Sequence, residues 1–171
     1  IAIFGGNGFM GSWLVNLLKS DHDIITFDIQ KKFSDYDSKR TAKMMSFRKG
    51  LLRGARQYKG DVRSLKQVQQ FLDKEKPEII VFLAGIPFVN FPDKILQFSV
   101  EPTGIFNILK ANKNLNSRIV YMSSLFAIGN FDHATTETTH LEPTTNYGIG
   151  KATCEHLIRS FSNNYGIIRT T

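Results

Sequence analysis

The chain has 171 residues, of which 42% are hydrophobic and 22% charged, and these proportions are typical of one globular domain with a substantial core. A single cysteine and the absence of any apolar run near the ~20 residues of a membrane span exclude a disulfide-rich scaffold and a membrane-spanning chain, and they favour a cytoplasmic protein. The net charge is +7, with its excess between residues 31 and 66, but no nucleic-acid-binding motif accompanies it. We therefore interpret this segment as a solvated surface, and we expect neither nucleic acid nor a membrane as a partner.

The first eleven residues resemble a short apolar strand, a glycine-rich turn and the start of a helix. Gly5, Gly8 and Gly11 follow the spacing G-x-x-G-x-x-G. Because glycine has no Cβ and takes positive φ, the backbone of such a turn can approach a pyrophosphate closely. The N–H groups at the start of the helix, at Phe9 and Met10, then favour the phosphate charge. By itself the motif also fits an ordinary strand-to-helix turn.

Helices and strands alternate along the rest of the chain, as judged from the period of the apolar residues. Residues 78–84 form the continuous apolar run of a parallel strand covered on both faces, and Ser64 is suited to cap a helix. Residues 41–52 are compatible with a helix but lack a clean apolar stripe. The predicted strands are residues 1–4, 23–28, 56–59, 78–84, 118–123 and 166–169, and the predicted helices are residues 9–19, 64–76, 101–109 and 147–161.

The helix that follows the fourth strand is expected to begin at about Glu101. Pro102 would then lie in the first turn, where its missing N–H removes no intrahelical hydrogen bond. Residues 85–98, before this helix, and residues 129–145, before the last helix, are expected to form irregular loops.

The alternation predicts an α/β fold in which a parallel sheet is wound on both faces. Right-handed crossovers place the loops after the first, fourth and fifth strands at one edge of the sheet, where ligands bind. Residues 5–11, 84–86 and 123–129 are therefore expected around one crevice.

The second predicted strand ends on a carboxylate, Asp28, at about the ~20 residues beyond the glycines that a dinucleotide site requires. Such a carboxylate accepts hydrogen bonds from both ribose hydroxyls of an adenosine and repels a 2′-phosphate, so NAD is favoured over NADP. Lys31 and Lys32 weaken this preference. The alternative is an Asp that caps a turn at the end of a strand.

Ser124, Tyr147 and Lys151 form a second set of candidate residues. The phenol and the ammonium lie one helical turn apart on the same face. A phenol is a poor base at neutral pH, but an adjacent ammonium and a cationic nicotinamide ring stabilise its phenolate form. Lys151 can also hold the nicotinamide ribose, and Ser124 can hydrogen-bond the oxygen of a substrate. Tyr and Lys at this spacing also occur as an ordinary surface pair on a helix.

These motifs together resemble the extended short-chain dehydrogenase/reductase family, which contains nucleotide-sugar epimerases and dehydratases. The resemblance spans essentially all 171 residues, and the chain is most similar to UDP-glucose/galactose 4-epimerases. Residues 37–40 resemble a cofactor-side segment of those epimerases. The residues that carry the likeness are Gly5, Gly8, Gly11, Asp28, Gly60, Asp61, Val62, Leu83, Ala84, Gly85, Ser123, Ser124, Gly129, Pro143, Tyr147, Lys151 and Glu155.

The resemblance implies a Rossmann-type doubly wound sheet with NAD as the cofactor. Asp61 and Val62 would contact the adenine, and Leu83, Ala84 and Gly85 would bind the cofactor, with residues 84–86 lining it on the nicotinamide side. Tyr147 would be the catalytic acid and base. Residues 1–171 would be the NAD-binding domain, with a C-terminal substrate lobe largely missing from this chain. The family likeness also suggests a homodimer through the fourth and last helices.

Two departures from the family pattern affect the expected chemistry. Glu101 and Pro102 stand where the family often has an Asn-Val pair, which puts a role for a helix-borne Asn in doubt. Leu125 and Phe126 follow Ser124 where dehydratases usually have acidic residues. Because neither side chain can move a proton, we argue against dehydration.

The leading hypothesis is therefore an NAD-dependent epimerase of a nucleotide sugar, acting by transient oxidation to a keto sugar and return of the hydride. Residues 143–148 also resemble threonine dehydrogenases, so an NAD-dependent dehydrogenase of a small hydroxy or amino acid is the alternative, as is another sugar-nucleotide dehydratase or reductase. A non-catalytic NAD-binding protein is a third possibility, against which the intact Ser124, Tyr147 and Lys151 argue. No His or Cys has the spacing of metal ligands, so no metal is expected.

Overall fold

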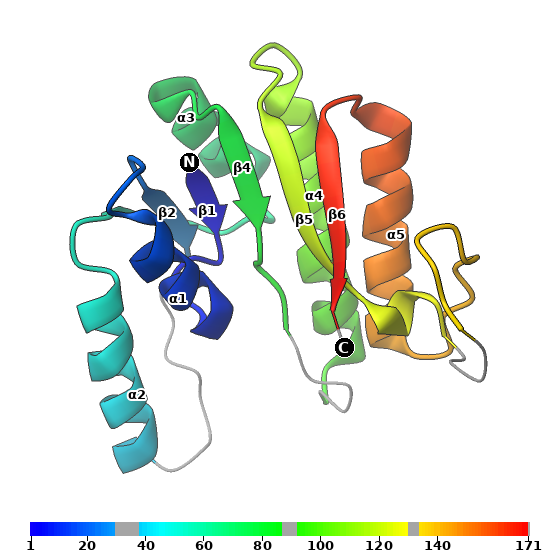
Figure 1. The fold of residues 1–171 in the computed structure, drawn as a ribbon, viewed down its shortest axis with the longest axis horizontal. Helices are drawn as coiled ribbons and strands as arrows, with labels where there is room; N and C mark the ends of the chain where they lie inside the picture. Colours follow the sequence, from blue (N-terminus) through cyan, green and yellow to red (C-terminus); the bar gives the residue numbers. More distant parts are fainter. Residues whose placement is uncertain (30–37, 87–91, 130–133, 171) are drawn as a thin grey trace.

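The computed structural model describes residues 1–29, 38–86, 92–129 and 134–170, without the side chains of residues 38–42, 44 and 45. In these residues six parallel strands form one sheet in the order β3-β2-β1-β4-β5-β6 (Figure 1). The strand order reverses between β1 and β4, so the loops that follow these two strands diverge at the carboxyl edge of the sheet. The strands are β1 (Ala2–Phe4), β2 (Ile25–Asp28), β3 (Arg56–Lys59), β4 (Ile79–Phe82), β5 (Arg118–Ser124) and β6 (Tyr165–Thr170).

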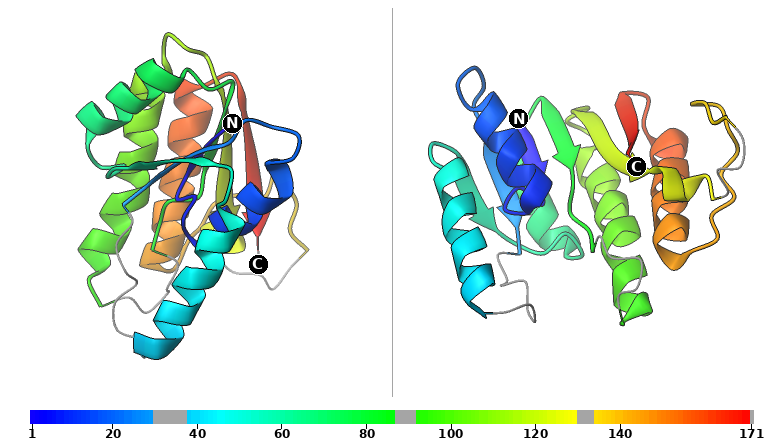
Figure 2. Two further views of the ribbon diagram at one scale, coloured as in Figure 1. Left: turned by 90° about the vertical axis from the view of Figure 1, so that its left-hand side faces the viewer. Right: turned by 60° about the horizontal axis from the view of Figure 1, so that its bottom comes forward.

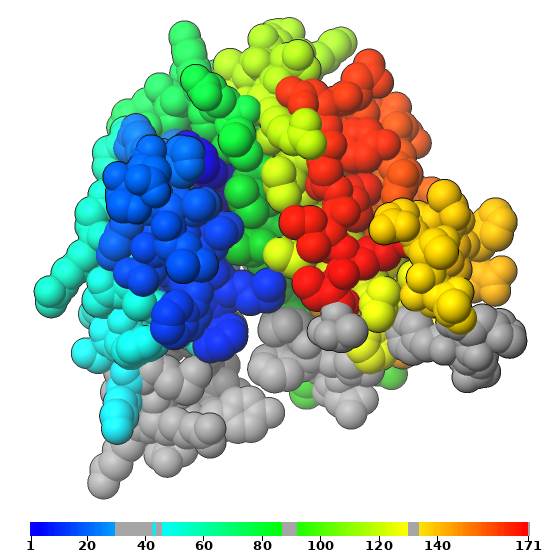
Figure 3. All heavy atoms as spheres, in the orientation of Figure 1, coloured from blue at the N-terminus to red at the C-terminus, as the bar shows by residue number. Residues whose placement is uncertain are grey.

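Helices cover both faces of the sheet, which confirms the predicted doubly wound α/β fold. Figure 2 shows α1 and α2 on one face, and α3, α4 and α5 on the other. No described helix covers β5 and β6 on the α1 side, where β6 lies open in Figure 3. The helices are α1 (Phe9–Leu18), α2 (Ser38–Leu51), α3 (Leu65–Glu75), α4 (Lys94–Asn112) and α5 (Asn146–Phe161), and a 3-10 turn, η1 (Leu125–Ala127), follows β5.

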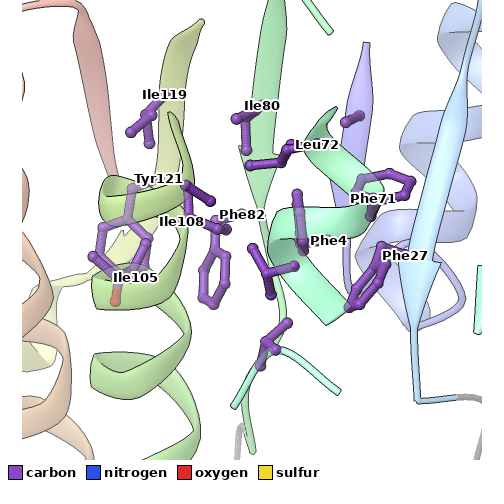
Figure 4. Close-up of a cluster of buried hydrophobic side chains, with 14 of the residues drawn as sticks. Phe4, Phe27, Phe71, Leu72, Ile80, Phe82, Ile105, Ile108, Ile119 and Tyr121 are labelled. Carbon is purple, nitrogen blue, oxygen red and sulfur yellow. The ribbon is translucent and has the colours of Figure 1, made fainter. Parts of the chain in front are cut away.

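The larger of two hydrophobic clusters lies between the sheet and helices α3, α4 and α5 (Figure 4). Phe4 of β1 is fully buried there, with its ring centre 5.1 Å from that of Phe27 and 5.4 Å from that of Phe71. The smaller cluster contains Ile3 and Val15 and lies under α1 on the other face. Successive residues of β1 therefore enter different clusters, as expected of a strand that is buried on both sides.

Most predicted elements are confirmed to within a few residues. Ser64 caps α3 by accepting a hydrogen bond from the backbone of Gln67. At the other end Lys76, which follows the last helical residue and precedes Pro77, takes the left-handed conformation. The helix α2 forms although it lacks an apolar stripe. No helix in the described part of the chain is long and apolar enough to cross a membrane.

The prediction for the start of α4 is wrong. The helix begins at Lys94 instead of Glu101, so Pro102 lies inside it and the expected loop is shorter. Asp93 caps the helix by accepting a hydrogen bond from the backbone of Leu96 at 2.9 Å. Pro102 has no N–H to donate to the carbonyl four residues earlier, but buried contacts hold the first half of the helix in place. One of these is the hydrogen bond from Gln97 to the carbonyl of Ile86 at 3.1 Å.

Candidate functional site

The glycine-rich turn joins β1 to α1 and packs directly on the loop after β4. Gly5 has φ +81°, and a Cβ at this position would lie 2.6 Å from the backbone nitrogen of Ala84. The backbone nitrogen of Leu83 donates to the carbonyl of Phe4 at 2.8 Å. A Cβ at Gly11 would collide with the carbonyl of Gly5. The first and third glycines are therefore required by the close packing of the turn, the helix and the β4 loop.

The start of α1 is suited to an anion. Gly8 occupies the N-cap position and supplies no side chain to accept hydrogen bonds from the first turn. The side chains of Phe9 and Met10 are 64% and 45% exposed. The first N–H groups of the helix therefore have no capping side chain, and their partial positive charge favours a phosphate. These features fit the pyrophosphate of a dinucleotide.

Asp28 lies beside the same turn, at the end of β2. Its Oδ2 accepts a hydrogen bond from the backbone nitrogen of Asn7 at 2.9 Å. Arg48 of α2 is buried nearby; burial lowers the pKa of this guanidinium, and the Asp28 carboxylate partly opposes that effect. The structure thus gives Asp28 the turn-capping role considered above, at the position expected of a ribose-binding carboxylate. Lys31, Lys32 and residue 37 lie outside the described residues, as do the side chains of residues 38–40.

The two residues expected near the adenine have different environments. The carboxylate of Asp61 accepts a hydrogen bond from the guanidinium of Arg63 at 2.6 Å. Val62 is 6% exposed, and its carbonyl accepts a hydrogen bond from the Asn107 side chain of α4 at 2.8 Å. Val62 is therefore a core residue whose backbone is fixed by α4. Sequence reasoning missed Asn107, because nothing local indicates that a helix residue supports a loop 45 residues earlier.

Tyr147 lies in the first turn of α5, beside the η1 turn that follows β5. Thr145 caps α5 by accepting a hydrogen bond from the backbone of Gly148 at 3.0 Å. A Cβ at Gly148 would collide with the carbonyl of Phe126, so this glycine lets α5 approach η1. The rings of Phe126 and Tyr147 pack edge to face with centres 5.8 Å apart. The phenol oxygen of Tyr147 makes no hydrogen bond with the described residues, so this oxygen is free to face a ligand.

Ser124 is the last residue of β5 and is 4% exposed. Its Oγ accepts a hydrogen bond from the backbone of Phe126 at 3.3 Å, which caps η1. The neighbouring Ser123 donates to the buried carboxylate of Glu155 at 2.6 Å. Ser124 is thereby fixed near the start of α5 while its own O–H can still be donated.

Lys151 follows Tyr147 by one turn of α5 and is 6% exposed. Its ammonium lies 5.4 Å from the centre of the Tyr147 ring, and it donates to Oε1 of Glu101 at 2.7 Å and to the carbonyl of Met122 at 2.8 Å. Burial lowers the pKa of Lys151, but the Glu101 carboxylate and other nearby groups outweigh burial and leave that pKa above its ordinary value. The ammonium therefore stays charged at neutral pH.

The structure brings the predicted catalytic residues together. Ser124 ends β5, Lys151 donates to Met122 of that strand, and Tyr147 packs on η1, which follows it. The glycine turn and the β4 loop lie at the same carboxyl edge of the sheet. Sequence reasoning noted Glu101 only as a departure from the family pattern and did not connect it with Lys151. Cys154 is fully buried, and burial raises the pKa of its thiol, so it is a packed side chain and not a nucleophile.

The model of the NAD dependent epimerase/dehydratase family matches residues 1–171. The chain belongs to this family. It is 26% identical over 172 residues to the UDP-glucose 4-epimerase of Lacticaseibacillus casei, covering 98% of this chain and 48% of that protein. It is 24% identical over 171 residues to the GDP-6-deoxy-D-talose 4-dehydrogenase of Aggregatibacter actinomycetemcomitans, covering 98% of this chain and 50% of that protein.

The fold is similar to that of Bordetella bronchiseptica WbmG, with a TM-score of 0.79, 21% identity and coverage of 99% of this chain and 52% of that one. The chain thus spans about half the length of the relatives that it matches. Family membership confirms the resemblance predicted from the motifs. The family is NAD dependent, which agrees with the prediction of NAD as the cofactor.

Proposed function

We propose that the full-length protein is an NAD-dependent epimerase of a nucleotide sugar. The observation that carries this proposal is the arrangement of Tyr147 and Lys151 of α5 beside Ser124 at the carboxyl end of β5. Two related proteins support the substrate class: the L. casei relative is named a UDP-glucose 4-epimerase, and WbmG is described in complex with NAD and UDP.

Residues 1–171 form the NAD-binding domain in this proposal. The N–H groups at Phe9 and Met10, with the glycine turn, would hold the pyrophosphate of the cofactor. The carboxylate of Asp28 accepts hydrogen bonds from the hydroxyls of the adenosine ribose, and Asp61 and Val62 lie against the adenine. Leu83 also binds the cofactor, and the nicotinamide side is lined by residues 84–86, Tyr147 and Lys151. Bound there, NAD would supply reversible hydride acceptance, which is the redox chemistry that inversion of a sugar carbon through a keto sugar requires.

Tyr147 moves the proton in both directions. Its phenolate removes the proton from the sugar hydroxyl as the hydride leaves, and the phenol returns a proton when the hydride comes back. The charged Lys151 stabilises the phenolate, and the O–H of Ser124 donates to the sugar oxygen and orients it. Net redox change is zero.

Dehydration is disfavoured by the residues that follow Ser124. Leu125 and Phe126 form η1, and neither has a group that can remove a proton from a sugar carbon. A dehydrogenase that releases NADH is the second candidate, because the A. actinomycetemcomitans relative is named a 4-dehydrogenase and residues 143–148 resemble threonine dehydrogenases.

The protein also forms a homodimer through α4 and α5. These helices pack side by side on one face of the sheet (Figure 2). They carry large exposed apolar side chains: Ile95 at 84%, Phe106 at 51%, Ile149 at 41% and Phe161 at 70%. Pairing of the two helices with those of a second copy would cover this surface.

The phenylalanine variant Tyr147→Phe tests the catalytic assignment in the full-length protein. It removes the phenol oxygen and keeps the ring contact with Phe126, so we expect turnover to fall about 100-fold or more while NAD binding is kept. Tyr165→Phe is the matched control, because Tyr165 begins β6 at the opposite edge of the sheet from the site. Undiminished turnover in Tyr147→Phe would contradict the assignment.

A further inference from the structure

The charge of Lys151 is met by a carboxylate from a different helix. Glu101 lies in the middle of α4, and the two side chains are 8% and 7% exposed. The ammonium nitrogen lies 2.7 Å from Oε1 of Glu101. Solvent and salt screen a pair this deeply buried very little, so each charge strongly affects whatever binds beside it.

Glu101 also fixes the direction of the ammonium. An ammonium has three N–H groups, and in Lys151 two of them are donated, to Glu101 and to the carbonyl of Met122. One N–H remains for a ligand or for Tyr147, whose ring centre is 5.4 Å away. The long side chain of Lys151 is thereby held in one arrangement.

Glu101 reaches this position because residue 85 is a glycine. A Cβ at Gly85 would collide with Oε1 of Glu101 and lie 2.7 Å from its carboxyl carbon. Gly85 belongs to the loop after β4 that, in the proposed function, lines the nicotinamide side of the cofactor. The carboxylate therefore lies directly against the backbone of the cofactor-lining loop.

The Glu101–Lys151 pair has a net charge of zero, and two other titratable groups beside it add none. Tyr121 of β5 and Cys154 of α5 are buried beside the pair, and burial raises the pKa of both, so they are neutral at neutral pH. Tyr147 faces Lys151 from α5. Without Glu101, the pocket would carry the uncompensated positive charge of Lys151.

This charge matters because the nicotinamide ring is cationic in NAD⁺ and neutral in NADH. A lone ammonium would repel the oxidised form and leave the reduced form unaffected. We propose that Glu101 is a positioning residue that holds Lys151 and cancels its charge toward the nicotinamide, so that the pocket does not disfavour NAD⁺ relative to NADH. This inference rests on the proposed function, in which the pocket must accept both forms of the nucleotide.

The ratio of the dissociation constants for NAD⁺ and NADH tests the inference. Both are measured by titration calorimetry on the full-length protein freed of nucleotide, for wild type and for Glu101→Gln. We expect the ratio of the NAD⁺ constant to the NADH constant to rise about fivefold or more in Glu101→Gln, with NADH binding little changed. Glu142→Gln, in an exposed loop, is the matched control and should leave the ratio unchanged.

If the role of Glu101 were merely structural, its replacement would weaken the binding of NAD⁺ and of NADH equally. An unchanged ratio in a folded Glu101→Gln variant therefore overturns the inference. Adding Lys151→Met to Glu101→Gln makes the pocket neutral again, and the ratio should return toward the wild-type value. Should Glu101→Gln fail to fold, Glu101→Asp gives the second test: its shorter side chain draws the carboxylate away from the ammonium, so the ratio should still rise, and no change overturns the inference. If the wild-type protein binds neither nucleotide, the proposed function itself fails.

Discussion

Glu155 of α5 is a fully buried carboxylate, and its hydrogen-bond partners are the hydroxyl of Ser123 and the guanidinium of Arg169. Its oxygens accept hydrogen bonds from Ser123 at 2.6 Å and from Nε and Nη2 of Arg169 at 2.9 and 2.8 Å. Burial raises the pKa of Glu155, but the hydrogen bonds from Arg169 and Ser123 outweigh it and leave that pKa below its ordinary value. The ion pair connects α5 to β5 and β6 directly behind Ser124.

Replacing Glu155 by Gln should therefore reduce the free energy of unfolding at pH 7 by about 3 kcal/mol, because the partly buried Arg169 loses its ion-pair partner. A carboxyl with a depressed folded-state pKa stabilises the protein above its unfolded-state value of 4.5, and this contribution is lost as the pH falls further toward the folded-state pKa. The difference between wild type and variant should thus shrink below about pH 4.5.

Urea unfolding of both proteins between pH 3.5 and pH 7 measures this dependence. Glu142→Gln, at an exposed position, should unfold like wild type throughout. Equal stability of wild type and Glu155→Gln at pH 7 would contradict the account of the buried pair.

At the scale of elements, the sheet and most helices could be predicted because their signals are local. A parallel strand covered on both faces is a continuous apolar run, as in residues 79–82, and Ser64 marks the start of α3 through its own cap. The start of α4 could not be read this way. The position of Pro102 favoured a later start, whereas the Asp93 cap and buried contacts of Gln97 extend the helix.

The residues of the candidate site, too, could be predicted only where their signals are local. The spacing of Tyr147 and Lys151 within α5, and the glycines of the turn, are local patterns that predict a nucleotide site. The partner of Lys151 is 50 residues away on α4, so it depends on how two helices pack. Glu101 was visible in the sequence only as an unexpected residue, and its contact with Lys151 required the structure.

At the scale of the whole molecule, the exposed apolar side chains of α4 and α5 predict a dimer that one charge should disrupt. Phe106 is 51% exposed on α4, and Phe47 is 56% exposed on α2, across the sheet. Phe106→Glu should shift the full-length protein from dimer to monomer in sedimentation velocity, because a buried unpaired charge opposes association. Phe47→Glu should sediment like wild type. A wild-type protein that sediments as a monomer at working concentration would reject the dimer.

The claim that the full-length protein epimerises a nucleotide sugar is tested most directly by following stereochemistry and redox state in one sample. UDP-, dTDP- and GDP-sugars and threonine are each incubated with the protein and NAD, while proton NMR reports the sugar and absorbance reports NADH. We predict that one nucleotide sugar is converted to its epimer without accumulation of NADH. Accumulation of NADH in proportion to an oxidised product, with no new epimer, would contradict the claim and assign the protein as a dehydrogenase.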